Sequence, residues 1–307
     1  MFDFDRKPLS LGRFARVPEW LWSTVYPLAH RRSPVPVATG LRIVAGVLLV
    51  FSVAGSGVVS ADVPGSLPDR AREQRLKDQI VDGLLDGEPI ELRTATGVDF
   101  LAIRTNSVTR PARGSVVILH GRGFHPDWAD VVHPLRVGLT EHGWDTLSVQ
   151  LPVLDKAAKY YDYYPVFPAA GERIEAALAA ARNLSAGKVV LIAHSCGSHM
   201  AQHWMLSNDP ETRQPFDAFV GIGMGATDFR QPMREPFALD RLKVPVLDLY
   251  GDDDYPAVHR LADERLAALR VGGNPASVQI VVPHADHYFR DRGEELLKAV
   301  SDWLDTL

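Results

Sequence analysis

The chain has very little cysteine: Cys196 is the only thiol in 307 residues. An intramolecular disulfide is therefore excluded, as are a zinc ribbon and a C-x-x-C redox site, which need cysteine pairs. The chain also lacks an excess of positive charge, since its formal net charge is −5 at pH 7. No basic stripe interleaved with aromatic residues follows residue 76, so the sequence gives no indication of nucleic-acid binding.

The N-terminal region differs in charge from the rest. Residues 1–42 contain seven Lys or Arg residues against three acidic ones, and residues 43–61 carry no charge at all. A basic segment, an apolar core and the small residues Val59-Ser60-Ala61 are typical of an export signal with its cleavage site. An uncleaved anchor in the inner membrane is the alternative. A buried core helix is disfavoured because residues 43–61 have no polar face. We therefore expect a periplasmic or extracellular protein.

The rest of the chain divides into a linker and helix at 62–88 and a domain at 89–307, in which β-like and α-like segments alternate. Buried strands separated by helices indicate a mainly parallel sheet with helices on both faces. About 23 residues separate the strands ending at Ile222 and starting at Val246, which leaves little room for a large cap domain. Strands are predicted at 89–93, 98–104, 115–119, 146–150, 188–192, 216–222, 246–250 and 278–282. Helices are predicted at 69–85, 130–141, 169–181, 199–205, 260–269 and 293–304.

The most informative segment is Ala193-His194-Ser195-Cys196-Gly197, between a predicted strand and a predicted helix. This is the setting of a nucleophile elbow, in which a sharp turn raises a serine hydroxyl above the end of a sheet. The following helix directs its N-terminal dipole and free N–H groups at the same point. The usual first glycine is replaced by Ala193, the next smallest residue. An ordinary β-to-α turn with a capping serine is the alternative.

A serine hydroxyl needs a neighbouring base, usually histidine, which a carboxylate orients. Late loops offer both groups: Asp254 follows the strand 246–250, and His287 follows the strand 278–282. Both loops come at the C-terminal edge of the predicted sheet, where Ser195 is also expected. A solvated turn or a weak cation site is the alternative for the acidic residues. The other candidates are Asp252, Asp253 and, further away, Asp228 for the acid, and His284 for the base.

With these residues in the order Ser195, Asp254, His287, the chain resembles the α/β-hydrolase superfamily from about residue 89 to its end. It also resembles an uncharacterised branch of exported bacterial members around His120, 160–165 and Ser195. The resemblance implies an α/β-hydrolase fold without a large cap. It makes Ser195 the nucleophile, His287 the base and Asp254 the acid.

The same resemblance implies an oxyanion hole. Two N–H groups hold the developing oxyanion in such enzymes, and their geometry is fixed before the charge appears. One is the N–H of the residue after the nucleophile, here Cys196. The other comes from the loop His120-Gly121-Arg122-Gly123, with Arg122 expected as the donor and Gly123 as the alternative. A simple strand-ending turn is the other interpretation of this loop.

The sequence also contains three weaker patterns. Tyr160 and Tyr161 are candidates for substrate binding, although tyrosines also cover apolar surface with their hydroxyls in water. Residues 221–226 fit G-x-G-x-x-A but do not open a helix, which disfavours a dinucleotide site. His199 and His203 have metal-ligand spacing but lack the glutamate of H-E-x-x-H.

The sequence therefore predicts an exported serine hydrolase that acts on an ester, thioester or amide through an acyl-enzyme. It needs no cofactor and no metal, and its partner is a small-molecule or lipid-like ester. An alcohol acceptor in place of water would make it an acyltransferase. A hydrolase-fold binding or scaffold protein of the cell envelope is the hypothesis of another class, because fold does not imply function.

Overall fold

The computed structural model describes residues 67–208 and 214–307. The predicted signal or anchor at residues 43–61 lies outside this part of the chain. Among the described residues, no helix is both long enough and apolar enough to cross a membrane.

An eight-stranded sheet forms the centre of the domain, in the order β1-β2-β4-β3-β5-β6-β7-β8. β2 runs antiparallel to both of its neighbours, and the other pairs are parallel. The strands are β1 Glu88–Arg93, β2 Asp99–Thr105, β3 Gly114–Leu119, β4 Trp144–Val149, β5 Lys188–His194, β6 Ala218–Ile222, β7 Val246–Asp253 and β8 Val278–Asp286. β7 and β8 are longer than predicted, because they stay paired past an irregularity at Gly251/Asp253 as far as Asp286.

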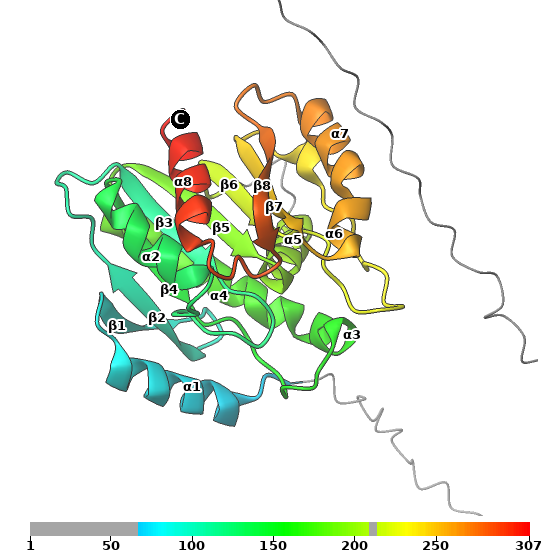
Figure 1. Ribbon diagram of the computed structural model, residues 1–307. Coiled ribbons are helices and arrows are strands. Elements are labelled where there is room, and N and C mark those ends of the chain that lie inside the picture. Colours follow the sequence, from blue (N-terminus) through cyan, green and yellow to red (C-terminus); the bar gives the residue numbers. More distant parts are fainter. Residues whose placement is uncertain (1–66, 209–213) are drawn as a thin grey trace, which may run out of the picture. The chain divides into compact units, whose positions relative to one another are not determined.

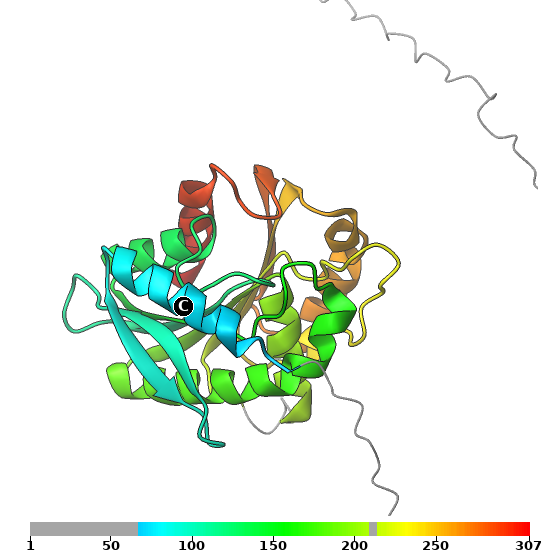
Figure 2. The ribbon, with the colours of Figure 1, turned by 90° about the horizontal axis from the view of Figure 1, so that it is seen from below.

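Helices cover both faces of the sheet. They are α1 Arg70–Gly83, α2 Val132–Glu141, α3 Tyr160–Tyr163, α4 Phe167–Leu184, α5 Cys196–Ser207, α6 Pro256–Arg260, α7 Ala262–Gly272 and α8 Gly293–Leu304, with 3₁₀ turns η1 Tyr164–Val166 and η2 Leu239–Arg241. Figure 1 shows α2 and α8 in front of the sheet, and the turned view in Figure 2 shows α4 on the opposite side from α8. The predicted α/β-hydrolase fold is confirmed.

The alternation of side chains along each strand explains these two layers. On β3, Val117 and Leu119 point into the cluster that contains α4 and α5. Val116 and Ile118 point into the other cluster, which contains α2 and α8. All four side chains are at most 1% exposed. A strand with apolar residues on both faces must be covered twice, which is why this central run reads as continuously hydrophobic.

The connection between β6 and β7, residues 223–245, contains no helix other than the short η2. The prediction that no large cap domain stands at this point is confirmed.

Helix α1 precedes the predicted start of the domain at residue 89, but it is firmly attached to the sheet. Glu73 of α1 forms an ion pair with Arg173 of α4 at 2.9 Å, and both side chains are buried. Ile80 of the same helix packs with Leu101 and Ile103 of β2. Because its contacts are buried, α1 is a structural part of the domain rather than a separate linker element.

Candidate active site

Five neighbouring strands direct the candidate residues to one edge of the sheet. β3, β5, β6, β7 and β8 are parallel, so their carboxyl ends lie together. The loop at His120 follows β3, Ser195 follows β5, Gly223 follows β6, Asp254 follows β7 and His287 follows β8. Such an edge is where open α/β sheets bind their ligands.

Ser195 has a strained backbone between β5 and α5. Its φ of 53° and ψ of −122° are rare for a residue with a side chain. The Ser195 N–H donates to the carbonyl oxygen of Ile222 on β6 at 2.8 Å, which holds the turn against the sheet. A Cβ on Gly197 would stand 2.5 Å from the carbonyl oxygen of His120, so only glycine fits there. Backbone strain of this kind concentrates at functional sites.

The three predicted side chains meet in one hydrogen-bonded chain. His287 Nε2 lies 2.8 Å from Ser195 Oγ, and His287 Nδ1 lies 2.6 Å from Asp254 Oδ1. His287 and Asp254 are almost fully buried, whereas Ser195 is partly exposed. A carboxylate on Nδ1 places the proton on that nitrogen and leaves Nε2 free to accept the serine proton.

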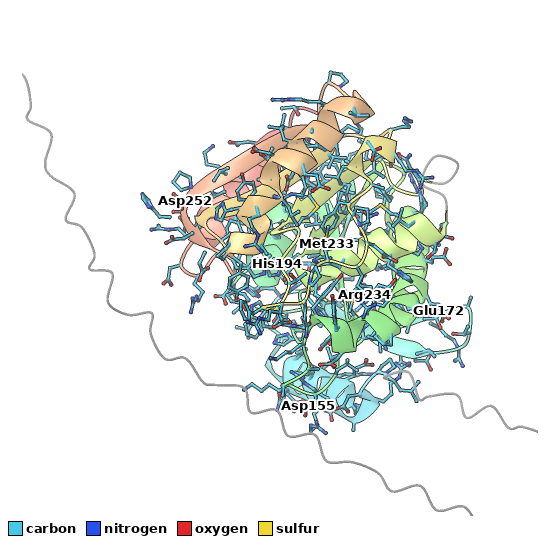
Figure 3. The ribbon with its side chains drawn as sticks, turned by 90° about the vertical axis from the view of Figure 1, so that its right-hand side faces the viewer. Asp155, Glu172, His194, Met233, Arg234 and Asp252 are labelled. Carbon is cyan, nitrogen blue, oxygen red and sulfur yellow. The ribbon has the colours of Figure 1, made fainter. Side chains whose placement is uncertain are left out.

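The structure also places the alternatives that the sequence left open. Asp252 and Asp253 are exposed at the end of β7, and Asp252 accepts a hydrogen bond from the His284 N–H at 2.6 Å. Figure 3 shows Asp252 at the outer margin of the domain. His284 is exposed as well, and Asp228 pairs with Arg122. None of these four residues is hydrogen-bonded to Ser195 or His287 in the described part of the chain.

His194, which precedes the serine, has a structural role that the sequence did not reveal. Its Nε2 lies 3.0 Å from the main-chain carbonyl oxygen of His287, so Nε2 carries the proton and donates it. Burial, together with the neighbouring His287, lowers the pKa of His194 to about 3. His194 is therefore a neutral residue that fixes the backbone of the His287 loop. The only sequence signal was its position inside the elbow.

Gly223 is a second residue whose role the sequence did not reveal. It lies in the G-x-G-x-x-A segment, in a left-handed conformation with φ of 62°. A Cβ on it would stand 2.9 Å from His287 Cε1, 3.0 Å from His287 Nδ1 and 3.3 Å from Asp254 Oδ2. This glycine therefore leaves room for the histidine and the acid.

The loop after β3 is held by the imidazole of His120. Its Nε2 accepts a hydrogen bond from the Leu151 N–H at 3.0 Å, so the proton is on Nδ1, which donates to the carbonyl oxygen of Gly121 at 2.7 Å. Because the Gly121–Arg122 peptide is trans, its N–H points away from His120. A Cβ on Gly121 would lie 3.3 Å from Ser195 Cβ, which brings this peptide close to the elbow.

The predicted donors have surroundings that suit the task. Cys196 is the first residue of α5, and the N–H groups in the first turn of a helix have no partner within that helix. The N–H of Arg122 belongs to the Gly121–Arg122 peptide, whose carbonyl oxygen is bound by His120. The carbonyl oxygen of Gly123, the alternative donor, accepts from Arg72 Nη2 at 3.0 Å. The assignment of Cys196 and of Arg122 or Gly123 as donors stays a prediction.

The side chain of Arg122 is engaged in an ion pair at the rim of the site. Both of its terminal nitrogens contact the carboxylate of Asp228, one of them at 3.3 Å. Asp228 also accepts from the Tyr160 N–H at 2.7 Å. Burial would raise the pKa of Asp228, but the bonds from Arg122 and Tyr160 hold it below its usual value. One carboxylate thus ties together the β3 loop, the start of α3 and the β6–β7 connection.

The two tyrosines predicted for substrate binding differ in their surroundings. Tyr160 is 3% exposed, and its hydroxyl accepts from the Arg234 N–H at 3.1 Å. Tyr161 is half-buried beneath the guanidinium of Arg234, whose carbon lies 4.3 Å from the ring centroid. Figure 3 labels Arg234 and its neighbour Met233 in the β6–β7 connection. Tyr160 therefore contributes mainly to packing, and a substrate contact of either tyrosine stays a prediction.

The thiol and the spaced histidines have other roles. Cys196 is 4% exposed, and burial raises the pKa of its thiol to about 12, which makes it inert as a nucleophile. His199 Nε2 donates to the carbonyl oxygen of Ala226 at 3.1 Å. His203 Nδ1 lies 2.9 Å from Glu235 Oε1. Within residues 67–208 and 214–307, no group of three or more potential ligands could hold a metal ion.

Comparison with known proteins agrees with this architecture. Residues 59–168 match a family described as a protein of unknown function (DUF3530). A search among curated proteins finds no match. Among solved structures, an α/β serine hydrolase without a lid from Xanthomonas campestris is 14% identical, with a TM-score of 0.53 over 72% of this chain and 95% of that one.

Two further structures are equally similar in fold. A dienelactone hydrolase from Anabaena variabilis is 18% identical, with a TM-score of 0.54 over 72% of this chain and 97% of that one. A cold-adapted esterase from an Arctic intertidal metagenomic library is 15% identical, with a TM-score of 0.54 over 71% and 92% of the two chains. At such identities the likeness concerns the fold. The chain therefore has the fold of the α/β hydrolases.

Proposed function

We propose that the protein is a serine hydrolase that cleaves a carboxylic ester, thioester or amide through an acyl-enzyme. One observation carries the proposal: Ser195 Oγ, His287 Nε2, His287 Nδ1 and Asp254 Oδ1 form a continuous chain with contacts of 2.8 and 2.6 Å. The strained backbone of Ser195 and its partial exposure support the same role.

In the first half of the reaction, Ser195 Oγ attacks the carbonyl carbon of the substrate while its proton passes to His287 Nε2. The carbonyl π electrons move to the oxygen, which the N–H groups of Cys196 and Arg122 stabilise. Asp254 keeps the proton on His287 Nδ1 and offsets the charge of the imidazolium. When the tetrahedral intermediate collapses, the leaving group takes the proton from Nε2.

In the second half, water attacks the acyl-enzyme, and His287 serves again as base and then as acid. The proton of the water passes to His287 Nε2 and from there to Ser195 Oγ, which restores the enzyme. An alcohol in place of the water would give a transferase with the same residues. No step needs a metal or an organic cofactor.

A fluorophosphonate probe tests the proposal. We expect the full-length protein to be labelled at Ser195 and to hydrolyse p-nitrophenyl acetate, and Ser195→Ala to lose both properties. Ser207→Ala is the matched control, because Ser207 is an exposed serine at the other end of the same helix, α5. A folded wild type that is not labelled would count against the proposal. It would favour the binding or scaffold protein as the alternative.

We also propose that the protein is exported. This proposal rests on the basic segment 1–42 and the uncharged segment 43–61, as read from the sequence. N-terminal sequencing of the protein from the cell envelope tests it. A new N-terminus at Asp62 supports cleavage after Ala61, and an intact N-terminus in the membrane fraction supports an anchor.

A further inference from the structure

An aromatic ring covers one face of the histidine of the site. The centroids of the Tyr255 and His287 rings are 4.5 Å apart, and their planes differ by 28°, so the rings are stacked. The two ring nitrogens of His287 are already bound, one by Ser195 and one by Asp254. Tyr255 therefore contacts the π face of the imidazole and leaves the in-plane hydrogen bonds intact.

The position of Tyr255 is fixed from two directions. Its N–H donates to Asp254 Oδ1 at 2.6 Å, and it is the N-cap residue of α6, which begins at Pro256. At the far end of the ring, its hydroxyl lies 2.9 Å from the hydroxyl of Tyr288, the residue after His287. A ring held at its backbone and at its hydroxyl is preorganised against the imidazole.

We infer that Tyr255 is a positioning residue that stabilises the imidazolium form of His287 while Ser195 is being acylated. The inference rests on the proposed function, because in that reaction His287 becomes positively charged when it takes the proton of Ser195. The face of an aromatic ring is electron-rich and attracts a cation stacked upon it. A neutral imidazole gains much less, so the contact favours the transition state over the resting state.

Other ionisable groups also face His287, and their contributions have to be separated from that of Tyr255. Asp254 lies at the end of β7, His194 at the end of β5, His199 on α5 and Tyr288 in the loop after β8. His194 and His199 are buried and neutral, since burial lowers their pKa values to about 3 and about 4. The planes of the Tyr288 and His287 rings differ by 75°, so these two rings form a T-shaped contact and not a stack.

Two kinds of substitution distinguish stabilisation of the positive charge on His287 from mere shielding of His287 from water. Tyr255 is 43% exposed, so replacing it disturbs little of the core. Tyr255→Phe keeps the ring face and removes the bond to Tyr288. Tyr255→Leu and Tyr255→Gln remove the face and admit more water to His287. Water favours the charged imidazole, whereas loss of the ring face disfavours it, so the two effects move the pH profile in opposite directions.

The experiment measures kcat and KM of the full-length protein with p-nitrophenyl acetate between pH 5 and 9. We expect Tyr255→Leu and Tyr255→Gln to lower kcat about five-fold, with KM changed less than about two-fold. We also expect the acid limb of kcat/KM to move to lower pH by about half a unit, because the protonated histidine is less stable without the ring. Tyr255→Phe should restore both values to near those of the wild type.

Three results would overturn the inference while the proposed function stands. The first is an acid limb of kcat/KM that stays in place or moves to higher pH in Tyr255→Leu and Tyr255→Gln. The second is an effect of these substitutions on KM alone, and the third is a Tyr255→Phe variant as impaired as Tyr255→Leu. Each result counts only if the wild type is active. A wild type that is neither active nor labelled by the fluorophosphonate overturns the proposed function and the inference with it. Thermal unfolding of each variant verifies that it is folded. If one of the two non-aromatic variants does not fold, the other still tests the inference.

Discussion

His194 and His287 are joined by a hydrogen bond across 93 positions of the chain, from the ring Nε2 of His194 to the main-chain carbonyl oxygen of His287 at 3.0 Å. The bond connects the residue before the candidate nucleophile to the backbone of the candidate base. It therefore sets the distance between the elbow and the His287 loop.

Removing this donor should slow the reaction of Ser195. We expect His194→Leu to reduce the rate of fluorophosphonate labelling about ten-fold or more, because small misplacements of a catalytic group are costly. His194→Gln is the matched variant, since the glutamine amide can donate from nearly the same place, and we expect it to stay within about three-fold of the wild type. Equal labelling rates for the two variants would show that the hydrogen bond is irrelevant.

Gly223→Ala should damage the site through a direct clash. The new Cβ would stand 2.9 Å from His287 Cε1, and the backbone has φ of 62°. We expect labelling to slow by about 100-fold as His287 is displaced. We also expect the free energy of unfolding to fall by about 1–2 kcal/mol, because the backbone conformation disfavours a side chain.

Gly225→Ala is the control for this prediction. Its φ is 97°, and its Cβ would meet Leu261 Cδ1 at 2.8 Å, away from His287. It shares the backbone strain but spares the histidine, so it should lose stability and keep its labelling rate. If both variants are labelled equally fast, the close approach of Gly223 to His287 has no functional importance.

Acidification should destabilise the fold through three buried histidines. Burial lowers the pKa of His120 and of His194 to about 3, and that of His199 to about 4, from the usual 6.5. The unfolded chain therefore binds more protons than the folded one below pH 6.5. The contribution of these groups is complete above pH 6.5 and is lost as the pH falls towards 4. The slope reaches about 4 kcal/mol per pH unit when all three take part.

Urea unfolding at pH 7.5, 6.0 and 5.0 measures this effect. His199→Gln should reduce the pH dependence by about one third, because one of the three groups is removed. His142→Gln, at an exposed position, should leave it unchanged. A free energy of unfolding that stays constant between pH 6.5 and 5 would contradict the prediction.

The attachment of α1 depends on a buried charge. Arg173→Met should lower the free energy of unfolding by about 3 kcal/mol, because it removes the buried cation that pairs with the carboxylate of Glu73 and leaves only the partly exposed Arg70 beside it. Lys298→Ala is the control, since Lys298 and Asp302 form an exposed pair worth less than about 1 kcal/mol. Urea unfolding compares the two variants. Similar losses in both would mean that α1 is not anchored by its ion pair.

Much of this protein could be predicted from its sequence because the evidence is local. The buried strands β3 and β5 are continuous apolar runs, which need no tertiary information to be recognised. The order of Ser195, Asp254 and His287 followed from where strands end. The short helix α3 was missed, because a helix of four residues is too short to carry a periodic pattern. The predicted helix 260–269 corresponds to α7, and the short helix α6, which ends before Leu261, was not predicted.

What the sequence by itself determined was the class of fold, the edge of the sheet that bears the site, and a short set of candidate side chains for its chemistry. Only the tertiary structure decided which of Asp252, Asp253 and Asp254 faces the histidine, and it alone brought Tyr255 onto the ring of His287 and Gly223 beneath it. The physical reason is the separation along the chain of the residues that interact. Strand and helix patterns arise from neighbours in the chain, whereas these contacts join separate loops whose relative positions depend on the packing of the whole sheet.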